Sequence, residues 1–242
     1  MSSPSILALN SGASSLRFAL FECADEIEQP LARGSVERIG GDGGKLWMRT
    51  RDDHRALERS QSFADHRAAV EAVCEAIEEA QLAAPKAVGH RMAHGGPSSR
   101  PQRVDDQLLE SLRELIPLAP LRLPYELSCI ESVSSRYDEL PQVVCFDTGL
   151  FATLPEVTRQ FPIPASLYEH PFQSRSFHGL SYESIVLLRG IGQAGLTILA
   201  HLGHGTSMIA LRDGHPVDVH HESGLLGAPD SSTDMRVILE RR

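Results

Sequence analysis

"LALNSGASSLRFAL", residues Leu7 to Leu20, joins two apolar runs through a short polar bend. Apolar residues alternate with small or polar ones on both sides of the bend, and this pattern predicts a β-hairpin. The bend contains Asn10, Ser14 and Ser15, and Arg17 follows it closely. A glycine turn exposes backbone N–H groups and neighbouring hydroxyls add donors, while an arginine adds charge suited to phosphate oxygens. The hairpin is therefore a candidate anion site.

The rest of the first half alternates between strand and helix patterns. Strands are predicted over 6–10, 16–23, 30–40, 45–51, 86–96 and 141–150, and helices over 65–82, 105–118 and 125–137. Asp65 is the expected N-cap of the first helix, whose apolar residues recur at helical spacing. Strands and helices in this order predict an α/β unit with a mixed sheet.

The second half begins the same kind of pattern again. A helix is predicted over 178–191, a strand over 196–205, and a hairpin over 207–219 that turns at Asp213 and Gly214. Shifting the opening hairpin by 192 positions places its Ser14–Ser15 pair on Thr206–Ser207. Two interpretations stay open: two related domains that each present a small-residue hairpin to one ligand, or two unrelated glycine-rich hairpins.

Composition excludes several classes of function. The 242 residues include 32 acidic and 23 basic side chains, a formal charge of -9, which disfavours nucleic acid as a partner. There is no run of 18 apolar residues and no secretory signal at "MSSPS", so we expect no membrane span and a cytoplasmic protein. The four cysteines are expected to be free, buried thiols; they are Cys23, Cys74, Cys129 and Cys145.

Three further residues are candidates for chemistry. Arg91 in "GHRMAHGG" precedes two glycines, and its guanidinium could bind a carboxylate through two parallel hydrogen bonds or pair with a structural acid. Its neighbours His90 and His94 are four apart, but the glycines argue against a helix and hence against a metal pair. Asp147 ends a buried-type strand, where α/β sheets bind ligands, and His178 starts a helix. Either residue could also be structural.

Taken in order, these motifs resemble those of the acetate kinase group, the acetate and propionate kinases of the sugar kinase/Hsp70/actin superfamily. "LNSGASSLRF" is similar to the first phosphate signature, "VGHRMAHGG" to the substrate-site motif, and "HLGHGTSMIALRDGHPVD" to the second phosphate signature. "LAPLRLP", "FDTGLFATLP" and "RSFHGLSYES" resemble further family motifs. The resemblance implies an α/β actin-like ATPase (ribonuclease H-like) fold, with a first lobe over 1–148 and a partial, shortened second lobe over 149–242.

The resemblance also implies an activity, the transfer of phosphate from ATP to acetate to give acetyl phosphate and ADP, with Mg²⁺ as cofactor. Arg91, Asp147 and His178 would be catalytic, with Asn10 and Asp147 near the metal. Arg91 would bind the acid, and Ala93, Leu121 and Phe177 would surround its alkyl tail. The implied ATP and phosphate ligands are Asn10, Ser14, Ser15, Arg17, His201, Gly203, His204 and Gly205. The family pairs through its second lobe, so a homodimer is possible.

The sequence departs from the family pattern in several places. "ESGLLGAPDSSTDMRVILE" follows the second phosphate hairpin almost at once, and the family's G-T-R motif, whose arginine serves the transition state, is absent between them. Arg122, Leu123 and His204 replace a histidine and two asparagines of the family motifs. A transition-state arginine is worth roughly 10³–10⁵ in rate, and Arg122 is a candidate to replace its charge. A shortened second lobe is also expected to leave apolar sheet surface uncovered.

Two other functions are therefore considered beside the carboxylate kinase. The first is a catalytically impaired remnant that binds nucleotide or a partner subunit. The second is a metal hydrolase that uses histidines of the second half, but these lack a glutamate at a general-base spacing. The histidines concerned are His201, His204, His215, His220 and His221.

Overall fold

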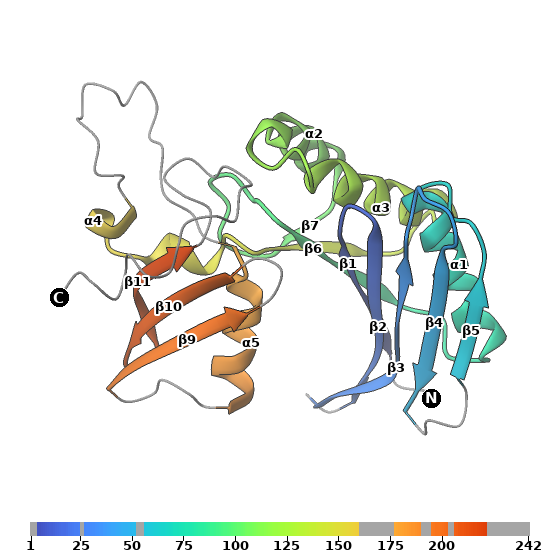
Figure 1. The fold of residues 1–242 in the computed structure, drawn as a ribbon, viewed down its shortest axis with the longest axis horizontal. Helices are drawn as coiled ribbons and strands as arrows, with labels where there is room; N and C mark the ends of the chain where they lie inside the picture. The colour runs from blue at the N-terminus through green and yellow to red at the C-terminus, as the bar shows by residue number, and fades with distance from the viewer. Residues whose placement is uncertain are drawn as a thin grey trace. The chain divides into compact units, whose positions relative to one another are not determined.

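The computed structural model describes residues 4–24, 27–51, 56–159, 177–189, 195–202 and 206–221. The chain divides into two compact units, Met1–Phe146 and Asp147–Arg242. This division falls two residues before the boundary that the sequence predicts. Figure 1 shows the elements of each unit.

The first unit is built on an eight-stranded sheet with the order β5-β4-β3-β2-β1-β6-β8-β7. β1 pairs antiparallel with β2 and parallel with β6, and β6 pairs parallel with β8, so the predicted mixed sheet is confirmed. The strands are β1 (Ser5–Ser11), β2 (Ser15–Ala24), β3 (Ile27–Glu37), β4 (Lys45–Thr50), β5 (Ala56–Ser60), β6 (Ala87–Met92), β7 (Gln102–Arg103) and β8 (Gln142–Phe146).

The helices of this unit are α1 (His66–Glu79), α2 (Asp106–Glu114), the short 3₁₀ helix η1 (Ile116–Leu118) and α3 (Leu123–Arg136). The Asp65 side chain accepts a hydrogen bond from the Ala68 N–H at 2.8 Å, which confirms it as the N-cap of α1. The apolar face of α1, with Ala69 and Val73, packs into one core with the strands and part of α3. Burial of this face, rather than local propensity alone, holds the helix in place.

The second unit contains a three-stranded antiparallel sheet with the order β11-β10-β9. Its elements are η2 (Leu150–Thr153), α4 (Glu156–Arg159), α5 (Gly179–Arg189), β9 (Leu196–Leu202), β10 (Thr206–Arg212) and β11 (His215–His221). β10 and β11 turn at Asp213 and Gly214, whose φ angles are 49° and 79°. The predicted Asp-Gly hairpin is therefore confirmed. A small core joins Phe151, Tyr182 and Ile209 across η2, α5 and β10.

One face of the second sheet carries exposed apolar side chains. Leu196, Ile198 and Leu202 alternate along β9 and are 73%, 73% and 76% exposed. The cross-strand neighbours of Ile198 and Ala200 on β10 are Ala210 and Met208, so the apolar surface continues onto that strand. This agrees with the expectation of uncovered apolar surface on this unit.

The hairpin of β1 and β2 and the hairpin of β9 and β10 are alike in sequence but differ in strand pairing. Ala8 lies opposite Ala19, whereas the corresponding Ala200 lies opposite Met208 instead of Leu211. The sequence echo therefore predicts two hairpins correctly but does not extend to their register. Residues 203–205, which connect β9 and β10, lie outside the described residues.

Several local expectations needed correction. β5 and β7 were not predicted, and the predicted helix over 105–118 is divided into α2 and η1 where Pro117 lies in the first turn of the 3₁₀ helix. All four cysteines are free, but only Cys74 and Cys129 are buried, while Cys23 and Cys145 are half-buried. Among the described residues, no helix has the length and apolar character that crossing a membrane requires.

Candidate active site

The first candidate region is the bend between β1 and β2. The Gly12 N–H donates to the Ser15 carbonyl at 2.7 Å and closes the turn. Asn10 and Arg17 lie opposite each other on the two strands and both are exposed. Ser14 is exposed and Ser15 half-buried. The four predicted phosphate ligands of this unit thus belong to one tight hairpin end with accessible polar side chains.

His66 forms a hydrogen bond to this turn. The residue is 3% exposed, and its Nε2 lies 2.7 Å from the Gly12 carbonyl oxygen, so Nε2–H donates the hydrogen bond. Burial lowers the pKa of His66, and the hydrogen bond to Gly12 opposes that shift. The ring also lies against Tyr125 of α3, with centroids 4.9 Å apart. Sequence reasoning missed this residue, because a histidine in the first turn of an amphipathic helix carries no signal of burial.

Arg91 lies on β6, beside β1 in the parallel part of the sheet. Its Nη1 donates to Asn10 Oδ1 at 3.1 Å, which joins the predicted acid-binding residue to a predicted phosphate ligand 81 positions earlier in the chain. The same Nη1 lies 4.0 Å from Glu126 Oε1. The sequence left open whether Arg91 binds a ligand or pairs with a structural acid. The structure places two groups beside it, the predicted phosphate ligand Asn10 and the acid Glu126.

Glu126 is a fully buried carboxylate in the first turn of α3. Its side chain has no exposed surface, and its Oε2 accepts the Ala93 N–H at 2.9 Å. One carboxylate therefore fixes the backbone two residues after Arg91 and faces the guanidinium of Arg91 itself. Sequence reasoning missed Glu126, since acidic residues in a first helical turn are normally solvated and favoured by the helix dipole alone.

The two histidines of the Arg91 motif have structural contacts. His90 is 3% exposed and its Nε2 lies 2.7 Å from Gln142 Oε1, while burial lowers the pKa of His90 to about 4. His94 Nδ1 accepts the N–H of Gly96 at 2.9 Å, and Gly96 has a φ of 58° that glycine adopts without strain. β6 ends at Met92, so the two histidines do not lie on one helix.

The predicted surroundings of the acid's alkyl tail differ widely in exposure. Ala93 has no exposed surface, whereas Leu121 is 62% exposed. Both belong to the first unit, and Phe177, which is half-buried, belongs to the second. The pocket that these three residues would form stays a prediction.

Asp147 and His178 come together in the second unit, 31 positions apart in sequence. Asp147 is 1% exposed, and its Oδ2 accepts the His178 N–H at 3.3 Å. The Asp147 carbonyl accepts the Gly179 N–H at 3.1 Å. A Cβ atom at Gly179 would lie 2.2 Å from that carbonyl oxygen, so only glycine fits at this start of α5. Burial and the nearby charge of Asp147 raise the pKa of Glu183, one turn further along the helix.

His178 has a φ of 70°, which is unusual for a residue other than glycine and costs about 1–3 kcal/mol. Such backbone strain is concentrated at functional sites. The His201 ring, another predicted ligand, stacks on the His178 ring with centroids 4.0 Å apart and planes inclined by 6°. His201 Nδ1 lies 3.1 Å from Ser181 Oγ. Asp147, His178 and His201 therefore form one cluster within this unit.

Other predicted features fall outside the described residues. Gly203, His204 and Gly205 of the second phosphate signature are among them, as is the segment 222–242. Among the described residues, no group of three or more His, Cys, Asp or Glu side chains is arranged to hold a metal ion. Two histidines of the hydrolase hypothesis, His215 and His220, are both exposed on β11.

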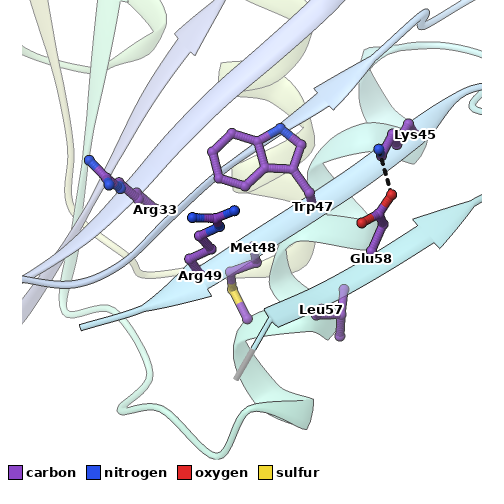
Figure 2. A pocket seen from close by; sticks show the side chains of 7 residues that line it. All are labelled: Arg33, Lys45, Trp47, Met48, Arg49, Leu57 and Glu58. Carbon is purple, nitrogen blue, oxygen red and sulfur yellow. Dashed lines mark ion pairs between the residues drawn. The ribbon is translucent and has the colours of Figure 1, made fainter. Parts of the chain in front are cut away.

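A shallow hollow of about 340 Å³ lies on the outer face of β3, β4 and β5. Figure 2 shows Trp47 and Arg49 from β4 beside Arg33 from β3, and it marks the ion pair of Lys45 and Glu58. Lys45 Nζ lies 2.5 Å from Glu58 Oε1. None of the residues that line this hollow is a predicted site residue. The candidate active site is therefore identified by its motifs and their contacts, and not by this hollow.

A family model, the acetokinase family, matches residues 5–221. The chain belongs to the acetokinase family. An acetate kinase of Pseudomonas aeruginosa (strain LESB58) is 32% identical over 293 residues, with all of this chain and 73% of that protein covered. An acetate kinase of Methylocella silvestris is 37% identical over 237 residues, covering 86% of this chain and 55% of that protein.

Solved structures of family members have the same fold. A Porphyromonas gingivalis acetate kinase aligns with a TM-score of 0.79 at 26% identity, and a Francisella tularensis propionate kinase with 0.80 at 27%. Each alignment covers 98% of this chain and 63% of the solved chain. The α/β fold class implied by the resemblance is thus confirmed.

This acetokinase-family chain is shorter than the relatives it matches. It spans 55% to 73% of the two curated acetate kinases and 63% of the two solved kinases. The alignment with the Pseudomonas protein extends over 293 positions, although the chain has 242 residues. Part of that relative therefore has no counterpart within the aligned span, which confirms the predicted internal shortening.

Proposed function

We propose that the chain is an ATP-dependent carboxylate kinase, which transfers the γ-phosphoryl group of ATP to acetate or a similar short-chain acid. The observation that carries the proposal is the 3.1 Å hydrogen bond between Arg91 and Asn10. It brings the residue suited to a carboxylate next to the phosphate-type hairpin. Membership of the acetokinase family supports the same reaction.

The chemistry requires little covalent help from the protein. A carboxylate oxygen of the acid forms a bond to the γ-phosphorus while the bond to the β-phosphate oxygen breaks, and ADP leaves with that electron pair. No proton has to be removed, because the carboxylate is already a nucleophile. The protein's part is to align the two oxygens and to neutralise charge on the transferred group.

Each unit supplies groups suited to that role. The Arg91 guanidinium would hold the acid by two parallel hydrogen bonds. Asn10, Ser14, Ser15 and Arg17 would bind phosphate oxygens at the hairpin end. In the second unit, His178 would donate a hydrogen bond to an oxygen of the phosphoryl group during transfer, and this kind of preorganised donor acts strongly on the transition state.

The chain also has groups of the kind that bind Mg²⁺. Magnesium prefers oxygen ligands and is bound at ATP sites through one or two carboxylates, several waters and the substrate phosphates. The amide oxygen of Asn10, which accepts from Arg91, and the carboxylate of Asp147 are ligands of this type, and we propose that they would hold the ion. When bound, the ion supplies positive charge that offsets the charge of the phosphates.

A second candidate function is an impaired family member that binds nucleotide or a partner subunit without efficient turnover. The observation that favours it is Glu126, a buried acid 4.0 Å from the guanidinium that should bind the substrate acid. A built-in carboxylate competes with an external one for the same cation. Arg122, the candidate for replacing the missing transition-state charge, is the half-buried N-cap residue of α3.

The two functions are separated by trapping the product. Purified chain is incubated with Mg-ATP, hydroxylamine and acetate, propionate or butyrate, and hydroxamate is measured. The kinase proposal predicts hydroxamate from at least one acid, with a strongly raised KM for the acid in Arg91→Ala and no change in Arg103→Ala, an exposed arginine on β7. Soluble protein that binds Mg-ATP in calorimetry but forms no hydroxamate would instead establish the impaired form.

The proposed partners are ATP or ADP, the carboxylate and a second copy of the chain. The exposed apolar residues Leu196, Ile198 and Leu202 on β9 support self-association through the second unit. Sedimentation velocity at several protein concentrations tests this, because a homodimer gives a concentration-dependent shift to the dimer mass.

A further inference from the structure

Two buried hydroxyl groups continue the hydrogen bonding of His178 into the core of the second unit. His178 Nδ1 lies 2.9 Å from Ser207 Oγ, and Ser207 Oγ lies 2.6 Å from the Tyr182 hydroxyl. Tyr182 has no exposed surface and Ser207 is 1% exposed. Tyr182 lies on α5, one turn after His178, and Ser207 lies on β10.

The number of available hydrogens decides which group donates in each of these two hydrogen bonds. Each hydroxyl carries one hydrogen, and buried donors in native structures find an acceptor. Burial raises the pKa of the Tyr182 phenol, and its hydrogen bond to Ser207 opposes that shift. Among the described residues, Ser207 is the only hydrogen-bond partner of the Tyr182 hydroxyl, so the phenol must donate to Ser207 Oγ.

The Ser207 hydrogen is then directed at His178. Since Ser207 Oγ accepts from Tyr182, its own hydrogen is donated to the other neighbour, the Nδ1 atom of His178. An Nδ1 that accepts a hydrogen bond is unprotonated, and a neutral imidazole then carries its hydrogen on Nε2. The opposite order would turn the Ser207 hydrogen toward Tyr182 and leave the phenol hydrogen without an acceptor.

We propose that Tyr182 and Ser207 are positioning residues that hold His178 as the Nε2–H tautomer, the form that donates from Nε2. The inference rests on the proposed function for its consequence, since that donor would serve the phosphoryl oxygen. The tautomer itself is a property of the free protein. Stacking on the His201 ring restrains rotation of the imidazole and so assists the same positioning.

Nuclear magnetic resonance measures the tautomer without any substrate. In the full chain with ¹⁵N-labelled histidine, the long-range ¹H–¹⁵N spectrum distinguishes protonated from unprotonated ring nitrogens at a pH where the ring is neutral. The His178 signals are assigned by their loss in His178→Gln. We expect hydrogen on Nε2 only, and a spectrum that places it on Nδ1 overturns the proposal even if the Tyr182 and Ser207 variants do not fold.

Variants then test the two positioning residues. Tyr182→Phe keeps the ring in the core and removes only the hydroxyl, and Ser207→Ala removes the group next to the imidazole. Both should shift the two His178 nitrogen resonances toward exchange-averaged values, whereas Thr153→Val, which removes an exposed hydroxyl bonded to the Leu150 carbonyl, should not. If neither Tyr182→Phe nor Ser207→Ala shifts these resonances, the proposal is overturned.

Turnover measurements distinguish positioning of His178 by Ser207 from a purely structural role of Ser207. A glutamine amide can replace an Nε2–H donor, so His178→Gln should retain more turnover than His178→Asn, and Ser207→Ala should lower kcat in the parent but not in His178→Gln. Equal losses in the glutamine and asparagine variants would contradict the assigned donor atom. A chain without kinase activity but with hydrogen on His178 Nε2 would contradict the proposed function alone.

Discussion

Glu126→Gln is the most informative single change in the first unit. The substitution keeps an oxygen that can accept the Ala93 N–H, now at 2.9 Å, but removes the charge that faces Arg91 at 4.0 Å. At that separation two unit charges interact by about 4 kcal/mol for an effective dielectric constant near 20. Desolvation of the buried carboxylate offsets much of this attraction.

The net expected loss is about 2 kcal/mol in the free energy of unfolding, within the range for hydrogen bonds to charged groups. For a chain of this size that corresponds to a Tm lower by roughly 4–8 °C. Urea denaturation followed by circular dichroism measures the difference. The matched control is Glu131→Gln, also on α3, whose pairing with Arg113 at 2.7 Å is half exposed and should contribute at most about 1 kcal/mol.

The same variant reports on the competition for Arg91. If Glu126 competes with the substrate acid, its neutralisation should tighten binding of acetate while it lowers stability. A Glu126→Gln protein as stable as Glu131→Gln would refute the reasoning, because the carboxylate would then contribute no more than an exposed one.

Three further changes have expected outcomes. His90 has a pKa of about 4 in the folded chain against an ordinary value of 6.5, so it contributes about 3 kcal/mol to the free energy of unfolding above pH 6.5, and this contribution is lost as the pH falls toward 4. His90→Gln should therefore flatten the dependence of the free energy of unfolding on pH over that window. An unchanged slope would contradict this. Gly179→Ala should destabilise the second unit, because its Cβ would lie 2.2 Å from the Asp147 carbonyl oxygen. Hydrogen exchange should then become faster in α5 and β10 and not elsewhere. Unaltered protection of these two elements would contradict the argument that only glycine fits at this position. Ile198→Thr should reduce self-association in light scattering, whereas Val157→Thr on α4, which is 81% exposed against 73% for Ile198, should not. Equal effects of the two substitutions would argue against a specific face.

Much of the fold was predictable because its signals are local. The hairpin at Asn10, the Asp65 cap and the Asp213 turn each depend on residues within a few positions of one another. β5 was missed because "ALERS" has a single large apolar residue and lies at the edge of the sheet. Its place is determined by pairing with β4 and not by a pattern of its own.

The site was predictable only in its motif residues. Arg91 and Asn10 could be brought together from sequence, because their strands were expected in one sheet. Glu126 and His66 could not be identified, because burial of a charged or polar side chain depends on the helix packing against the sheet. Ser207 left one signal, its position in the sequence echo of Ser15, but the hydrogen bond to His178 depends on tertiary structure.

The proposed function requires that groups of both units act on one phosphoryl transfer. A crystal structure of the chain with Mg-ADP and acetate tests it most directly. The account predicts the acetate carboxylate on the Arg91 guanidinium, the ADP phosphates at the Asn10 hairpin, and His178 and Asp147 facing the gap between acetate and ADP. Acetate bound away from Arg91, or His178 and Asp147 remote from the bound phosphates, would contradict it.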